Sequence, residues 1–196
     1  MSQLIFATGN DHKASEVRQI LSIDGLVINT LKDIGFTQDI AETGSTMTEN
    51  AIIKSQTIYN QYNKNVFSDD SGIEVEALDM APGLYSARYA GEHKNDKDNL
   101  NKLLLNMDGV SNRSARFRAV VALIWNGEVH TFEGIVNGQI TDVAYGGGGF
   151  GYDPIFKPNN YDETFAELNG EIKNKISHRY KAFAKMKKFL ESQNEL

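Results

Sequence analysis

The sequence predicts an α/β or α+β domain whose β-sheet contains both parallel and antiparallel strands. Early in the chain, short apolar runs alternate with segments of helical periodicity, which favours parallel strands joined by helices. In the middle, two long apolar segments flank Asn126-Gly127, a dipeptide typical of a two-residue hairpin turn. Together the two patterns predict one mixed sheet flanked by helices.

The first four elements are predicted from apolar runs and helix caps. Residues 4–7 form an apolar run closed by Thr8-Gly9-Asn10, and residues 26–31 form a second strand. A capping box at residues 46–49 opens a helix that extends to about Tyr62. Between the first two strands another helix begins after Asn10 or Asp11. Its apolar residues recur at helical spacing: Ala14, Val17, Ile20 and Leu21.

The later elements are predicted in the same way. A strand at residues 65–68 is expected to end at the two aspartates that follow, and residues 73–78 alternate with period two, as an edge or hairpin strand does. Residues 96–107 have a helical pattern, and residues 115–125 and 128–137 form the predicted antiparallel pair. Ser177 is expected to cap the last helix. The inward-facing residues of that helix are Ala182, Phe183, Met186 and Leu190.

Length and composition limit the class of protein. A chain of 196 residues with 40% hydrophobic and 23% charged residues suits one domain over residues 1–196, with two lobes around a shared core. The absence of cysteine excludes thiolate ligands and thiol nucleophiles. The chain has neither a signal-peptide pattern nor an apolar run near the ~20 residues of a membrane span, so we expect a cytoplasmic protein without membrane contact. A net charge of -6 argues against nucleic-acid binding but permits a small phosphorylated ligand.

Two neighbouring carboxylates, Asp69 and Asp70, come where an apolar run stops. They repel each other unless a cation lies between them, and Mg²⁺ prefers such hard oxygen ligands. Glu42, in a loop before a helix, offers a third carboxylate. The competing interpretation is an ordinary turn, because Asp, Ser and Gly are common turn residues, and residue types alone favour the turn.

The turn at residues 8–13 is a candidate for binding phosphate. A strand, a glycine turn and a helix start follow one another, with Lys13 in the first helical turn. Free N–H groups at a helix start favour an anion. Local sequence explains the segment equally well as an ordinary strand–helix connection.

Two segments near the C-terminus are further candidates. Residues 146–153 place Phe150 and Tyr152 among five glycines, which suits either base stacking or a flexible loop with its aromatic rings in the core. His178 and Arg179 open the last helix, where cations are electrostatically unfavourable, so their position suggests a function. Lys173, upstream of them, faces either solvent or a phosphate.

Taken together, these segments resemble the inosine/xanthosine triphosphate pyrophosphatase family, also called the Ham1-like non-canonical purine nucleotide pyrophosphatases. The match runs from residue 4 to the last helix in the family's order and spacing, with no motif missing. The matching motifs are Thr8-Gly9-Asn10 with Lys13, Glu42-Thr43-Gly44, Glu49-Asn50-Ala51 with Lys54, SDDSG at 68–72, PGLYSARY at 82–89, GFGYDPIF at 149–156 and ISHR at 176–179.

The resemblance implies hydrolysis of ITP, dITP and XTP to the monophosphate and pyrophosphate, which clears deaminated purines from the nucleotide pool. It also implies an α/β fold with two lobes around a central active-site cleft, and a homodimer. Asp70 is the expected proton acceptor and a Mg²⁺ ligand, with Glu42 and Asp69 as further metal ligands. The expected substrate-binding residues are Thr8, Gly9, Asn10, Asp11, His12, Lys13, Ser71, Phe150, Gly151, Tyr152, Asp153, Lys173, His178 and Arg179.

Two other functions compete with this interpretation. A Maf-like pyrophosphatase acts on modified pyrimidine or guanine nucleotides, and it predicts a preference for dUTP. A non-catalytic nucleotide-binding protein predicts the loss of a carboxylate, whereas Glu42, Asp69 and Asp70 are all present.

Overall fold

The computed structural model describes residues 2–193, apart from the side chains of Ser2 and His12. The chain divides into two compact units. Unit 1 takes the residues up to Asp70, Ala119–Gly134 and the residues from Arg179 onward, and unit 2 takes Ser71–Arg118 and Ile135–His178. No helix in the described part of the chain is long and apolar enough to cross a membrane. One domain over residues 1–196 stays a prediction.

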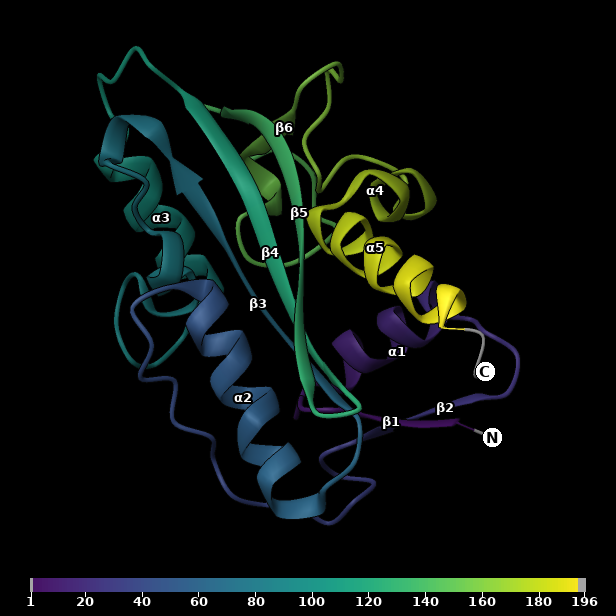
Figure 1. Ribbon diagram of the computed structural model, residues 1–196. Helices are drawn as coiled ribbons and strands as arrows, with labels where there is room; N and C mark the ends of the chain where they lie inside the picture. The colour runs from purple at the N-terminus through teal and green to yellow at the C-terminus, as the bar shows by residue number, and fades with distance from the viewer. Residues whose placement is uncertain (1, 194–196) are drawn as a thin grey trace. The chain divides into compact units, whose positions relative to one another are not determined.

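Six strands form one mixed sheet in the order β2-β1-β3-β4-β5-β6 (Figure 1). Strand β1 pairs in parallel with both β2 and β3, and β5 pairs antiparallel with β6. This confirms the predicted mixed sheet. The strands are β1 Ser2–Phe6, β2 Leu26–Thr30, β3 Val66–Val75, β4 Ser114–Trp125, β5 Glu128–Ile140 and β6 Phe156–Pro158.

The hairpin between β4 and β5 forms where the sequence predicts it. Asn126 and Gly127 have φ values of 50° and 86°. Positive φ at both central residues is the geometry of the type I′ turn, whose twist matches that of the flanking strands. A connection of two residues makes the pair antiparallel.

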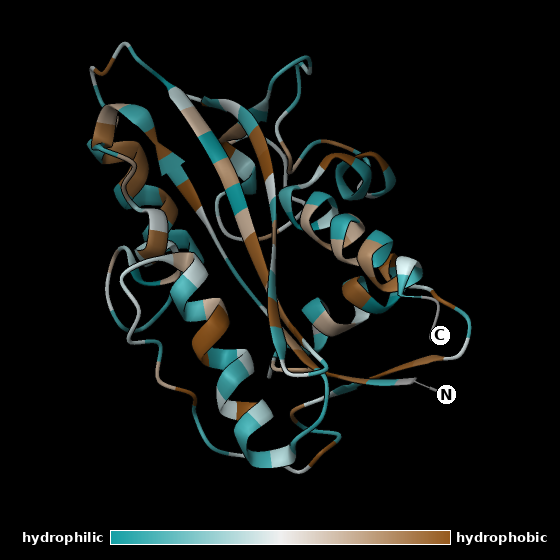
Figure 2. Ribbon diagram, in the orientation of Figure 1, coloured by the Kyte–Doolittle hydropathy of each residue, from teal (hydrophilic) through white to brown (hydrophobic). Residues whose placement is uncertain are grey.

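In unit 1 the sheet is covered on both faces. Helices α1 (Asp11–Ile20) and α5 (His178–Ser192) lie together on one face, where Phe67 of β3 packs with the apolar residues of both helices (Figure 1). Helix α2 (Met47–Tyr62) covers the other face, where Ile58 packs with Val66. The second half of β4 is accordingly buried throughout and mostly brown in Figure 2.

The predicted caps position the first two helices. The Asn10 side chain accepts a hydrogen bond from the Lys13 N–H, and the Thr46 side chain accepts one from the Glu49 N–H. The Glu49 carboxylate reaches back beyond the cap and accepts from the N–H and hydroxyl of Ser45. The starts of α1 and α2 are therefore fixed by side chains that local sequence identifies.

Strand β3 differs from the prediction. The sequence predicts a strand that ends at Asp69-Asp70 and a second strand at residues 73–78, but one strand runs from Val66 to Val75, and Glu76–Leu78 is a 3₁₀ helix. Turn-forming residues thus lie in mid-strand, because pairing with the neighbouring strands outweighs their local preference. The predicted turn at the two aspartates is wrong.

Unit 2 has its own core around the second half of β3 and the first half of β4. Helix α3 (Asp96–Asn106), predicted as residues 96–107, contributes Leu100 and Leu103 to this core. The prediction missed β6, the 3₁₀ helices at Gly83–Arg88 and Asp153–Ile155, and helix α4 (Gly170–Ile176). Ser177, predicted to cap α5, follows α4 as its C-cap, and α5 begins at the next residue.

Candidate active site

The candidate residues form two groups, one in each unit. The carboxylate cluster of unit 1 comprises Glu42, Asp69 and Asp70 with the cations Lys13, Lys54 and Arg179. The aromatic loop of unit 2 comprises residues 149–153 together with Lys173. Each group is held by its own interactions.

The two aspartates point to opposite faces of the sheet, because successive side chains of a strand alternate. Phe67, two residues before Asp69, packs on the face of α1 and α5. Ser68, two residues before Asp70, donates its hydroxyl to the Ala51 carbonyl of α2 on the other face. The neighbouring carboxylates therefore have separate environments.

Asp69 is buried against two cations from helix starts. Its side chain is 2% exposed, and the Lys13 amine lies 3.0 Å from Oδ2 and 3.3 Å from Oδ1. The Nε atom of Arg179 lies 3.7 Å from Oδ2. Burial alone would raise the pKa of Asp69, but the nearby cations, with Lys13 the strongest, lower it to about 2. Asp69 is therefore an anion at neutral pH.

Asp70 has the opposite shift. Its Oδ1 atom lies 3.8 Å from the Lys54 amine, which is 2.7 Å from Oε1 of Glu42. Burial raises the pKa of Asp70, and the negative charges of Glu42 and Asp69 raise it further, against the opposing effect of Lys54. A carboxylate with a raised pKa is a stronger base, which suits a proton acceptor.

Lys54 is a further candidate site residue, to which the sequence motifs assigned no role. Burial lowers the pKa of its amine, but the carboxylates of Asp70, Asp69 and Glu42 outweigh burial and raise it above its ordinary value. Lys54 therefore stays charged between Glu42 and Asp70. Its place in a matching motif on the predicted second helix was the available signal.

The turn before α1 is organised by its own side chains. The Asn10 N–H donates to Oγ1 of Thr8, and the Lys13 N–H donates to Oδ1 of Asn10. Gly9 and Asn10 are exposed, as is Asp11 in the first turn of the helix. The side chain of His12, an expected substrate contact, lies outside the described residues. The turn thus presents an exposed helix start with Lys13 directed to Asp69.

Two carboxylates, Glu42 and Asp70, are available to a metal ion, and they do not form a complete coordination shell. Among residues 2–193 there is no group of three His, Cys, Asp or Glu side chains that could hold a metal ion. Glu42 and Asp70 share the Lys54 amine, whereas Asp69 is paired with Lys13 and Arg179. Mg²⁺ often binds through one or two carboxylates and completes its shell with water and substrate phosphates, so this donor set fits Mg²⁺.

In unit 2, Asp153 fixes the aromatic loop. Its Oδ2 atom accepts a hydrogen bond from the Phe150 N–H at 2.8 Å and pairs with the Lys173 amine at 2.6 Å. Gly149 has φ +75°, and a Cβ at this position would overlap the Asp153 carboxylate. The loop therefore needs glycine at 149 for both its conformation and its close contact.

The two aromatic residues of the loop have different environments. The Phe150 ring is 58% exposed, and the Lys173 amine lies 5.2 Å from its centroid. The Tyr152 side chain is 5% exposed and donates its hydroxyl to the Ser86 carbonyl. Burial raises the pKa of the Tyr152 phenol, so it stays neutral. Only the Phe150 ring can stack on a ligand, and Tyr152 belongs to the core of unit 2.

The remaining predicted residues are described in their own units. In unit 2, the His178 ring stacks on Phe117 with centroids 4.8 Å apart and planes 9° apart, and Ser71 is half-buried on β3. In unit 1, the guanidinium of Arg179 is 2.9 Å from the Glu16 carboxylate. Arg179, an expected substrate-binding residue, is thus paired with the acids of unit 1. Glu16, three residues after Lys13 on α1, was missed by the sequence reasoning.

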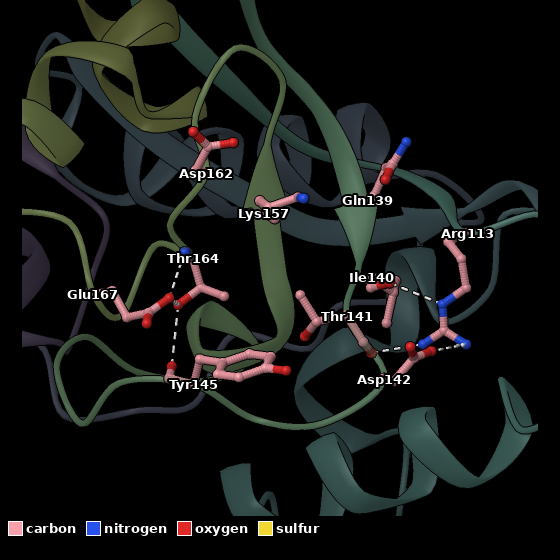
Figure 3. Close-up of a pocket in the computed structure, with 10 residues that line it drawn as sticks. All are labelled: Arg113, Gln139, Ile140, Thr141, Asp142, Tyr145, Lys157, Asp162, Thr164 and Glu167. Carbon is pink, nitrogen blue, oxygen red and sulfur yellow. Dashed lines mark hydrogen bonds and ion pairs between the residues drawn. The ribbon is translucent and has the colours of Figure 1, made fainter.

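Unit 2 also contains a polar pocket of about 420 Å³ that none of the predicted site residues line (Figure 3). Arg113 at one end donates to the carbonyls of Ile140 and Thr141 and pairs with Asp142. At the other end Thr164 and Glu167 are hydrogen-bonded to each other. Arg113, Thr164 and Glu167 are thus occupied by contacts within the fold, and we assign the pocket no role.

The fold and the carboxylate cluster define an α/β protein with an acid–base site suited to a phosphorylated ligand. The Ham1 family model matches residues 4–189, and the chain belongs to the Ham1 family. It is 48% identical over 180 residues to the dITP/XTP pyrophosphatase of Flavobacterium johnsoniae, covering 92% of this chain and 93% of that protein. It is 46% identical over 195 residues to the dITP/XTP pyrophosphatase of Bacillus subtilis, covering 98% of each.

Solved structures give the same result. The Staphylococcus aureus Ham1 protein has a TM-score of 0.93 at 40% identity, covering 98% of this chain and 100% of that one. A HAM1 protein from Coxiella burnetii also has a TM-score of 0.93, at 36% identity and with the same coverage. The chain therefore has the fold of its family over nearly its whole length.

Proposed function

We propose that this chain hydrolyses the non-canonical purine nucleoside triphosphates ITP, dITP and XTP to the monophosphate and pyrophosphate. The observation that carries the proposal is Asp70, a largely buried carboxylate with a raised pKa beside Glu42 and Lys54. The family membership and the activity named for its relatives support it. In a cell this reaction removes deaminated purines before they enter DNA or RNA.

Unit 1 would bind the phosphates. The exposed helix start at residues 9–11 offers N–H groups to an anion, and the Lys13 amine adds a positive charge. The side chain of Lys13 is 26% exposed, so its amine can remain on Asp69 and still contact a phosphate oxygen. These groups stabilise the negative charge that develops on the departing pyrophosphate.

Asp70 would accept the proton of the attacking water. Water is a weak nucleophile, and removal of its proton during attack on the α-phosphorus lowers the barrier. Glu42 and Asp70 would hold Mg²⁺. The resemblance implies Asp69 as a further ligand, but its pairing with Lys13 and Arg179 does not favour that role. When bound, Mg²⁺ neutralises phosphate oxygens and lowers the pKa of bound water. Lys54 keeps Glu42 and Asp70 ionised together by placing one cation between them.

Unit 2 would bind the base. The exposed Phe150 ring offers a stacking surface, and the Lys173 amine and His178 ring offer hydrogen-bond donors. Hypoxanthine and xanthine carry a keto oxygen at position 6, where adenine carries an amino group. A donor aimed at that oxygen is left unpaired opposite adenine, and a buried unpaired donor is costly.

The test is pyrophosphate release from ITP, dITP, XTP, GTP, ATP and dUTP, with and without Mg²⁺. We expect Mg²⁺-dependent release that is fastest with ITP, dITP or XTP. Preference for dUTP would instead support the Maf-like function. Binding of ITP without any turnover would support the non-catalytic nucleotide-binding protein.

We propose a homodimer on the family resemblance alone, and we keep the cytoplasmic location expected from the sequence as a proposal. Sedimentation equilibrium of the full chain tests the first, and a monomer at micromolar concentration would contradict it. Fractionation of the source cells tests the second.

A further inference from the structure

The Asp69 carboxylate is already flanked by two positively charged side chains. Both of its oxygens lie within 3.3 Å of the Lys13 amine, and Oδ2 also faces Nε of Arg179. The carboxylate is 2% exposed. A cation that entered this site would meet two positive side chains already there, which would repel it.

The two cations beside Asp69 come from places where positive charge is unfavourable. Lys13 lies in the first turn of α1, and Arg179 is the second residue of α5. The N-terminus of a helix carries partial positive charge, so a cation there needs a nearby anion. Asp69 faces both cations, and Glu16 is 2.9 Å from Arg179. The two helix starts are thus joined by one buried carboxylate.

We infer that Asp69 is a positioning residue that holds Lys13 and Arg179 for the phosphates, and that it is not a ligand of Mg²⁺. This inference rests on the proposed function. Strand β3 separates the positioning of the phosphate-binding cations from the binding of Mg²⁺. The alternation of its side chains puts Asp69 among the cations of α1 and α5 and puts Asp70 beside Glu42 and Lys54.

The first measurement compares Asp69→Asn with Glu42→Gln as the matched control. Asparagine keeps the shape of aspartate and removes its charge. We expect Asp69→Asn to weaken binding of inorganic pyrophosphate, measured by calorimetry, by about tenfold or more. The Mg²⁺ concentration for half-maximal ITP turnover should stay within about twofold of wild type. Glu42→Gln should raise that Mg²⁺ concentration by roughly tenfold or more.

A double-mutant cycle identifies the residue through which Asp69 acts. Pyrophosphate binding is measured for Asp69→Asn, Lys13→Gln and the double variant. We expect the losses to be non-additive by roughly threefold or more, because the two residues form one interaction. Asp69→Asn and Glu42→Gln should give additive losses.

Loss of Asp69 leaves Lys13 and Arg179 without their shared anion, which could destabilise the fold. A control for folding is therefore needed. The Lys13→Gln/Asp69→Asn double variant removes one charge of each sign, and thermal unfolding checks it. Glu16→Gln disturbs Arg179 from outside the cluster and should weaken pyrophosphate binding less than Asp69→Asn does. A raised Mg²⁺ requirement in Asp69→Asn with unchanged pyrophosphate binding would overturn the inference.

The proposed function can fail independently of this inference. A wild-type protein that binds pyrophosphate but hydrolyses no purine triphosphate would refute the activity. The double-mutant cycle, measured by pyrophosphate binding, would still show whether Asp69 positions Lys13.

Discussion

The carboxylate cluster of unit 1 and the aromatic loop of unit 2 are built in different ways. Apart from Glu42, which lies in the loop before α2, the cluster is carried by a strand and by helices, and Asp69 is buried between cations. Residues 149–153 of the aromatic loop lie outside the strands and α-helices and are held by Asp153, which accepts from Phe150 and from Lys173 of α4. The Phe150 ring, which we propose as the stacking surface, is exposed.

This difference matches the two parts of the proposed reaction. Phosphate chemistry is the same for every triphosphate and benefits from charges that are fixed before the substrate arrives. Base recognition depends on a few donors and a stacking surface, which a loop on a rigid scaffold can supply. Substitutions in the cluster should therefore affect turnover and phosphate binding, and substitutions in the loop should affect binding of the base.

The largest effect is expected from Asp70→Asn. Loss of the proton acceptor should lower pyrophosphate release by roughly 10²–10⁴-fold. The variant should still bind ITP, measured by calorimetry, and the loss should be similar for ITP and XTP. Near-normal turnover would refute the role of Asp70. A loss confined to one of the two substrates would contradict the assignment of phosphate chemistry to unit 1 and of base binding to unit 2.

A smaller effect on binding is expected from Phe150→Ala. Stacking of a base on an aromatic ring contributes about 1–3 kcal/mol, so KM for ITP should rise by roughly 5- to 150-fold. The kcat should change little, because the ring does not contact the reacting phosphate in this proposal. Phe150→Tyr serves as the control and should keep a near-wild-type KM. A lower kcat with unchanged KM would contradict the stacking role.

Gly149→Ala tests how the loop is held. Alanine would have an unfavourable φ of +75° and would overlap the Asp153 carboxylate. We expect a loss of roughly 1–3 kcal/mol in unfolding free energy, together with a raised KM. The control is Gly147→Ala, because a methyl group on Gly147 would meet no atom within 4 Å and this residue does not need positive φ. Equal effects of the two substitutions would contradict this account of the loop.

Local sequence predicted much of the fold, and the reasons are visible in particular residues. Asn10, Thr46 and Asn126-Gly127 each determine a cap or turn by their own side chain or conformation, so the adjoining elements appear where expected. Strand β3 was misjudged because its continuation through Asp69-Asp70 depends on pairing with other strands.

The sequence named the candidate site residues, but it did not show which of them pair with each other. The motifs identified the carboxylates, yet Lys13 is 56 residues from Asp69, and no local pattern joins them. The separation of Asp69 from Asp70 follows from strand alternation, which a predicted turn concealed. Phe150 and Tyr152 likewise could not be told apart, because their exposure depends on contacts such as the one with Ser86.

The last prediction concerns acid stability and is specific to Asp69. Its pKa is lowered to about 2 in the folded protein, against 3.8 as its ordinary value. A lowered folded pKa stabilises the protein above the ordinary pKa, and this stability is lost as the pH falls through the folded pKa. The contribution is about 2 kcal/mol at neutral pH. Urea unfolding of wild type and Asp69→Asn should show a difference that shrinks between about pH 5 and pH 2. A constant difference would contradict this linkage.

The most direct test of the central claim is hydrolysis of ITP by the wild-type protein in ¹⁸O-labelled water with Mg²⁺. We expect IMP and pyrophosphate in equal amounts, with the label in the phosphate of IMP, because water attacks the α-phosphorus. Formation of IDP and inorganic phosphate, or label in the pyrophosphate, would contradict it.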